Sequence, residues 1–158
     1  SRARIKKGFY LPNGARERKF NTANGKANFS VNPVPKNMVP KNHFIMMTIR
    51  THDQYNTTIY GMDDRYRGIL NERRVILMNP TDMEAAGLNK FDIVDLHSKW
   101  KDEVRTAHNF KVVPFDIAIG CTATYFPETN VLVPINSVAR GSNTPASKFV
   151  IIELSKKS

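Results

Sequence analysis

The residue types most able to do chemistry lie in two polar runs. The first begins where the apolar residues Phe44–Met47 end, and most of its side chains are able to donate or accept hydrogen bonds. It reads Thr48-Ile49-Arg50-Thr51-His52-Asp53-Gln54-Tyr55-Asn56-Thr57-Thr58-Ile59-Tyr60-Gly61. The second is Tyr125-Phe126-Pro127-Glu128-Thr129-Asn130, followed by Ser142-Asn143-Thr144-Pro145 and by Lys148. A rigid scaffold typically presents a binding loop in this way. Two such runs in one small chain predict a site for a large polar ligand.

The side chains in these runs suit a flat, nitrogen-rich ligand that carries phosphates. Asn, Gln and Thr offer paired donors and acceptors that match the edge of a pterin or a purine. Arg50, Arg65 and Arg67 offer planar, permanently charged groups for phosphate. The alternative is that Asn and Thr only stabilise turns here, which is their commonest role. Local chemistry does not choose between these two hypotheses.

Other kinds of chemistry have little support in the sequence. Cys121 lies among small apolar residues, so we expect it to be structural, in the core of a strand, and not a reactive thiol. The histidines have no partners at a zinc-like spacing, and no glycine-rich phosphate loop occurs. The sequence therefore predicts neither catalytic nor metal-binding residues in this chain.

The net charge of +10 is concentrated in the first part of the chain. Residues 1–41 contain ten Lys or Arg and one acid, a net charge of +9. Residues 42–158 contain fourteen Lys or Arg and thirteen acids, a net charge of +1. The excess therefore belongs to a basic leader, and such tails are more often solvated than engaged with nucleic acid.

Length and composition indicate one domain with an appendage. Residues 1–42 lack periodicity and predict a basic linker with one short extended piece at Ala27–Val31, while residues 43–158 predict the folded domain. No apolar stretch has the length of a membrane span. The single cysteine, Cys121, indicates a reducing, cytoplasmic compartment. The missing initiator Met suggests a piece of a longer protein.

The apolar runs of the folded domain predict a mainly β structure. We expect one short helix, with Thr81 or Asp82 as its N-cap and Gly87 at its C-terminal end. The expected strands are Phe44–Arg50, Arg74–Met78, Phe91–His97, Val104–Val113 with a break near Asn109, Ile117–Ala123, Val131–Ile135 and Lys148–Leu154. Six or seven short strands with polar connections indicate a small closed barrel.

The polar runs also resemble a known module. Thr48–Arg50, Gln54–Gly61 and Asp64–Gly68 are similar to the opening of the C-terminal molybdopterin-dinucleotide-binding domain of formate dehydrogenase-like molybdopterin oxidoreductases. Three further segments agree in order and spacing: Val75–Asn79 with Asp82 and Gly87; Gly120–Ala123 with Tyr125–Leu132; and Ser142–Lys148. The resemblance covers roughly residues 42–154.

This resemblance implies a six-stranded double-psi β-barrel that lies over a bis(molybdopterin guanine dinucleotide) cofactor, with molybdenum or tungsten, and closes its pocket. The metal ligand, an iron–sulfur cluster and the acid–base residues would belong to other domains of the same polypeptide, with an electron-transfer subunit as a further partner. This chain alone is expected to fold and to be inactive. The implied cofactor-binding residues are Arg50, Gln54, Asn56, Thr57, Thr58, Asn130, Thr144 and Lys148.

The chain departs from the family between Leu88 and Val94, where a Gly-Asp turn is replaced by Asn89-Lys90-Phe91-Asp92. We expect Asn89 to take the left-handed conformation in place of glycine. Two other functions stay open. One is a nucleic-acid-binding β-barrel, favoured by the positive charge and by tyrosines as stacking platforms. The other is a docking module that contacts a partner subunit but no cofactor.

Overall fold

The computed structural model describes residues 4–34, 36–55, 61–101 and 103–157. The chain divides into two units, Ser1–Asn37 and Met38–Ser158. In the first unit, residues 5–34 form neither helix nor strand, so the extended piece expected at Ala27–Val31 is not part of a sheet. Local hydrogen bonds order this unit, such as that from Tyr10 Oη to Glu17 Oε1 at 2.9 Å.

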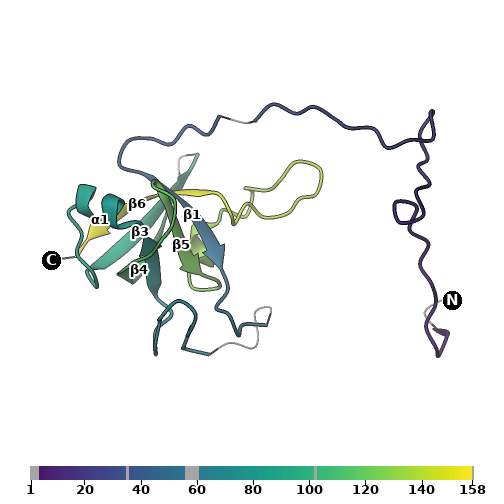
Figure 1. Ribbon diagram of the computed structural model, residues 1–158. Helices are drawn as coiled ribbons and strands as arrows, with labels where there is room; N and C mark the ends of the chain where they lie inside the picture. Colours follow the sequence, from purple (N-terminus) through teal and green to yellow (C-terminus); the bar gives the residue numbers. More distant parts are fainter. Residues whose placement is uncertain (1–3, 35, 56–60, 102, 158) are drawn as a thin grey trace. The chain divides into compact units, whose positions relative to one another are not determined.

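The second unit is the closed, mainly β barrel that the sequence predicts (Figure 1). Around the barrel the strands follow the order β1-β5-β2-β4-β3-β6. β1 pairs in parallel with β5, and β2 with β4, whereas the remaining neighbours are antiparallel. The elements are β1 (Phe44–Ile49), β2 (Val75–Met78), α1 (Pro80–Ala85), β3 (Ile93–Trp100), β4 (Glu103–Pro114), β5 (Cys121–Tyr125), the 3-10 helix η2 (Asn130–Leu132) and β6 (Val150–Lys156).

This pairing gives the barrel two different ends. At one end β1 and β5 finish, and the long connections 50–74 and 126–149 leave the barrel there; we call it the loop end. At the other end β1 and β5 begin and β2 finishes, and α1 follows β2 directly; we call it the helix end. The two polar runs that the sequence singles out therefore belong to the same end of the barrel.

β2 shows why a continuous apolar run forms a strand here. All of its residues are buried, and alternate side chains enter different clusters. Ile76 and Met78 belong to the main core, whereas Val75 and Leu77 join Tyr125 and Ile69 in a second cluster. Because successive side chains of a strand point to opposite faces, a strand buried on both faces must be apolar throughout.

The predicted helix exists, but its N-cap is different. Asn79 caps α1, and its side-chain oxygen accepts a hydrogen bond from Thr81 N at 2.9 Å. Neither Thr81 nor Asp82 is the cap, because Pro80 is the first residue of the helix and the cap is the residue before it. Asp82 instead accepts a hydrogen bond from Gly120 N at 2.7 Å, which ties α1 to the segment before β5. Gly87 has a positive φ of 65°, as expected at a helix C-terminus.

Two strand predictions are wrong in part or whole. β5 begins at Cys121 and not at residue 117, because Gly120 turns the chain at φ 78° and the buried Thr122 and Thr124 belong to the strand. The strand expected at Val131–Ile135 does not form. η2 stands in its place, since Leu132 N donates to Thr129 O at 3.0 Å and Leu132 alone of that apolar run is fully buried.

The break expected near Asn109 does not occur, because β4 continues through Asn109 as a bulged strand. Asn109 has φ 62°, and the pairing of β3 with β4 shifts register between Val94 and Leu96. The left-handed residue of the 88–94 turn, however, is Phe91 with φ 72°, and not Asn89. The backbone NH of Asn89 donates to Asp92 Oδ2 at 2.7 Å, which fixes the turn by a side-chain hydrogen bond.

Candidate functional site

The parallel pairing of β1 and β5 brings the two polar runs together. Ile49 lies opposite Tyr125 in the register, and Phe126 N donates to Ile49 O at 2.8 Å. The segment before β6 reaches the same place, because Thr48 N donates to Ser147 O at 3.0 Å. Three segments that are far apart in the sequence therefore meet at the loop end.

A hollow of about 560 Å³ opens where these segments meet. Arg50 and Lys148, both exposed, line it together with Arg67. Arg67 is paired with Asp64 and also donates to Arg50 O at 3.3 Å, and Lys148 Nζ donates to Thr48 O. Within the described part of the chain, neither Arg50 nor Lys148 forms an ion pair with a carboxylate. The hollow therefore has positive charge available for an anionic group.

Gln54 lies beneath this surface and not on it. Its side chain is buried, and Nε2 donates to Phe126 O at 2.9 Å while Oε1 accepts from Thr51 N at 3.3 Å. The amide therefore joins the first polar run to the second. The other residues expected in this run, Asn56, Thr57 and Thr58, lie outside the described residues.

Asn130 and Thr144 are exposed and do not line the hollow. Asn130 begins η2, and its backbone NH donates to Pro127 O at 2.9 Å. Thr144 Oγ1 donates to Ser142 Oγ at 3.0 Å in the turn before β6. Of the described residues expected to bind a cofactor, the structure thus groups Arg50 and Lys148 in the hollow, places Gln54 below it, and leaves Asn130 and Thr144 apart from it.

The sequence analysis missed Arg73, whose side chain is only 2% exposed. Its Nε donates to Glu128 Oε1 at 2.6 Å, and Nη2 donates to Glu128 Oε2 at 3.1 Å. Nη2 also donates to Gln54 Oε1 at 3.1 Å and to Phe126 O at 3.0 Å. We call Arg73 together with five of its hydrogen-bond partners the Arg73 cluster: Thr51, Gln54, Gly61, Phe126 and Glu128.

A second buried network supports the same end of the barrel. Tyr125 Oη donates to Asp64 Oδ2 at 2.9 Å, and Arg67 donates to the same oxygen. Burial alone would raise the pKa of Asp64, but the hydrogen bonds from Arg67 and Tyr125 outweigh it and hold that pKa below its usual range. Burial and the neighbouring Asp64 carboxylate raise the pKa of Tyr125. Tyr125 is therefore a neutral donor throughout the physiological range.

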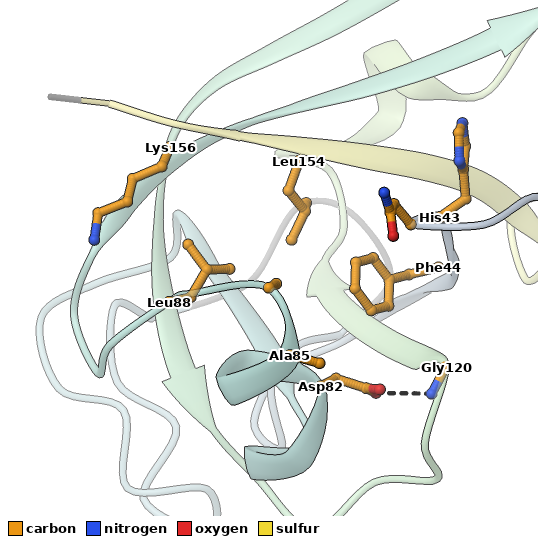
Figure 2. Close-up of a pocket in the computed structure, with 10 residues that line it drawn as sticks. His43, Phe44, Asp82, Ala85, Leu88, Gly120, Leu154 and Lys156 are labelled. Atoms are coloured by element: carbon orange, nitrogen blue, oxygen red, sulfur yellow. Dashed lines mark hydrogen bonds between the residues drawn. The ribbon is translucent and has the colours of Figure 1, made fainter.

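The helix end has a cavity of a different kind, about 470 Å³ in volume (Figure 2). Phe44, Leu88 and Leu154, from three different parts of the chain, turn their side chains toward a common space there. Two of its charged residues are already engaged: Asp82 with Gly120 N at 2.7 Å, and Lys156 with Asp92 at 2.6 Å. This cavity offers an apolar surface and no free cation for phosphate among the described residues.

No cluster of three or more His, Cys, Asp or Glu able to hold a metal ion occurs among the described residues. Cys121 is half-buried at the start of β5. The described residues also form no helix that is long and apolar enough to cross a membrane. The described groups able to bind a ligand are therefore hydrogen-bonding and positively charged side chains at the loop end.

The sequence pattern of one family, described as the molydopterin dinucleotide binding domain, matches residues 44–151. This chain belongs to that family. The matched range spans β1 to the beginning of β6 and so includes the loop end, the Arg73 cluster and α1. Membership confirms the resemblance that the polar runs indicate.

Relatives of this molydopterin dinucleotide binding domain occur in longer proteins. Uncharacterized oxidoreductase Rv2900c of Mycobacterium tuberculosis is 48% identical over 159 residues, which cover 97% of this chain and 20% of that protein. Protein YdeP of Escherichia coli K12 is 37% identical over 156 residues, which cover 93% of this chain and 20% of that protein. The chain thus spans about a fifth of the length of these relatives.

Proposed function

We propose that this chain is the C-terminal cofactor-binding domain of a larger two-electron oxidoreductase. Its loop end forms one wall of the pocket for a bis(molybdopterin guanine dinucleotide) and closes that pocket. The observation that carries the proposal is the meeting of Arg50, Lys148 and both polar runs around one open hollow, in a chain of the molydopterin dinucleotide binding family. The residues present fit such a ligand, because its phosphates need cations and its pterin needs hydrogen-bonding partners.

We assign the roles of the individual residues as follows. Arg50 and Lys148 bind phosphate oxygens from the hollow, and the exposed side chain of Asn130 binds a second face of the ligand. Gln54 acts from below, since its amide is engaged with the backbone of Phe126. Asn56, Thr57, Thr58 and Thr144 stay predictions of the family resemblance.

The finer identity of the parent protein is also a proposal. The parallel pairs β1–β5 and β2–β4 within a closed barrel support the double-psi type. We infer a formate dehydrogenase-like parent in the cytoplasm, with molybdenum or tungsten on the cofactor and an iron–sulfur cluster in another domain. When bound, the cofactor would supply the two-electron chemistry, and this domain would bind and orient it.

The test compares cofactor content in variants of the full-length polypeptide. The double variant Arg50→Ala/Lys148→Ala removes both unpaired cations of the hollow. A hydrogen bond to a charged group contributes roughly 1.5–3 kcal/mol, so we expect bound pterin dinucleotide to fall by about tenfold or more. Lys99→Ala, an exposed cation on β3, is the matched control and should keep wild-type content. Equal cofactor in the double variant and the control would contradict the proposed wall.

A second measurement tests the parent activity. The purified full-length protein should oxidise formate with an artificial electron acceptor, and this chain alone should not. A full-length protein that holds the pterin dinucleotide but ignores formate would remove the formate dehydrogenase-like assignment and leave the cofactor-binding role in place.

A further inference from the structure

We propose that Arg73 is a positioning residue that fixes the first polar run to the second and so sets the shape of the hollow between them. This inference rests on the function proposed above. Arg73 does not line the hollow and is almost fully buried. It therefore acts on the ligand only through the backbone and side chains that it holds.

Among the described residues, Arg73 forms hydrogen bonds with both runs. On the first run, its guanidinium reaches Thr51 Oγ1 at 3.4 Å, Gln54 Oε1 at 3.1 Å and Gly61 O at 3.2 Å. On the second run, it reaches Phe126 O at 3.0 Å and both oxygens of Glu128. One rigid, planar group thus spans both polar runs, and its position depends on both.

These contacts lie next to the residues that form the hollow. Thr51 follows Arg50 in the chain, and Phe126 both accepts a hydrogen bond from Arg73 and lines the hollow. A displacement of the Arg73 guanidinium would therefore move the backbone on both sides of the hollow. Only arginine supplies five donors in a fixed plane, so a lysine at this position would satisfy few of the acceptors.

The charge of Arg73 is neutralised where it lies. Glu128 forms a bidentate ion pair with Arg73. The Arg73 guanidinium also lies over the ring of Tyr125, 5.2 Å from the ring centroid. Because the pair is buried and adds no net charge to the hollow, its effect on the ligand is one of geometry and not of attraction. This separates Arg73 from Arg50 and Lys148, whose charges are available in the hollow.

The test uses variants of the full-length polypeptide that separate position from stability. Arg73→Met leaves the largely buried Glu128 without its ion-pair partner, whereas Arg73→Met/Glu128→Leu replaces the whole pair with apolar side chains and should recover most of the lost thermal stability. We expect the double variant to fold, to retain about tenfold less pterin dinucleotide than the wild type, and to exchange the amide hydrogens of residues 51–55 and 126–129 faster. Arg73→Lys, which keeps the charge, should lose cofactor in the same way.

Arg74→Met is the matched control, because the neighbouring arginine donates to His108 O at 2.8 Å and packs over Phe110. It should leave loop exchange and cofactor retention at wild-type levels. Wild-type cofactor retention in the Arg73→Met/Glu128→Leu and Arg73→Lys variants would overturn the inference, as would unchanged loop exchange. If the wild-type protein itself holds no pterin dinucleotide, the proposed function fails, while loop exchange still decides whether Arg73 positions the two runs.

Discussion

The two ends of the barrel are closed by different kinds of contact. At the loop end, buried polar side chains hold long connections: Arg73 with Glu128, Gln54 with Phe126, and Tyr125 with Asp64. At the helix end, α1 and a short turn cover the barrel, and Phe44, Leu88 and Leu154 supply apolar contact (Figure 2).

The difference shows that one barrel supports a compact end and an irregular end by different kinds of contact. Apolar packing at the helix end is non-directional and tolerates small changes of shape. Hydrogen-bonded networks of buried polar groups are directional, so they hold an irregular backbone in one arrangement. A long irregular loop needs the second kind of support, and the structure places that support directly beneath the hollow.

The largest expected effect is the loss of the buried arginine at the loop end. Arg73→Ala should lower the free energy of unfolding by about 3–5 kcal/mol, because Glu128, only 14% exposed, and the buried Thr51 and Gln54 lose this partner. Arg74→Ala, an exposed neighbour, should cost no more than about 1 kcal/mol. Urea denaturation of the two variants measures both values. A similar loss of unfolding free energy in the two variants would contradict the expected difference between a buried and an exposed arginine.

The corresponding change at the helix end is Leu88→Ala. Loss of this buried side chain should lower the free energy of unfolding by about 2–4 kcal/mol through the cavity that it leaves. Cofactor content of the full-length variant, measured after purification, should stay at the wild-type level because the hollow lies at the other end. Ile135→Ala, an exposed apolar control, should change neither quantity. A Leu88 variant that folds but loses its cofactor would show that the two ends are coupled.

Tyr125→Phe removes one hydrogen bond from the loop end and should cost about 1–3 kcal/mol at neutral pH. The Tyr125 hydroxyl helps to hold the pKa of Asp64 below 3.8, so the Asp64 carboxylate stabilises the fold above that pH. This contribution is lost as the pH falls through the lower folded-state pKa.

Unfolding free energies of the wild type and Tyr125→Phe, followed from neutral to acidic pH, should therefore converge at the acid end. A gap between them that stays constant or widens on acidification would show that Asp64 does not carry the effect.

The smallest expected effect lies in the turn that leads into β3. Phe91 is 56% exposed and has φ 72°, a conformation that is costly for a bulky side chain. Phe91→Gly should therefore raise the free energy of unfolding by about 1 kcal/mol, measured by thermal denaturation. Phe91→Ala, which keeps a Cβ atom, should give much less of this gain. A destabilised glycine variant would mean that the contact between Lys90 and the Phe91 ring outweighs the backbone strain.

Several features follow from local sequence alone. The apolar run of β2 and the run that begins at Phe44 predict their strands because burial on one or both faces imposes a pattern on consecutive residues. Asn109 predicts a local irregularity in its strand because asparagine tolerates a left-handed backbone conformation. The polar run after β1 predicts a binding loop because its side chains cannot form a core. In each case the physical cause lies within a few residues of the feature.

Other features escaped because their cause is distant in the sequence. Val131–Ile135 has the composition of a strand, yet Leu132 enters the core from η2 while Val131 and Ile135 are exposed. In the sequence, Arg73 resembles an ordinary charged residue beside Arg74. No neighbouring residue indicates that Arg73 contacts Glu128 and Gln54 in the fold. Phe91 takes the position expected for Asn89 because the hydrogen bond from Asn89 N to Asp92 fixes the turn in another way.

The sequence by itself determined the class of fold, the order of most strands and the two polar runs that mark the site, since these depend on hydrophobic pattern and residue type. Only the tertiary structure decided which polar residues are exposed in the hollow and which are buried beneath it. The parallel register of β1 and β5 sets the two runs side by side, and the buried charge of Arg73 requires partners that only this arrangement supplies.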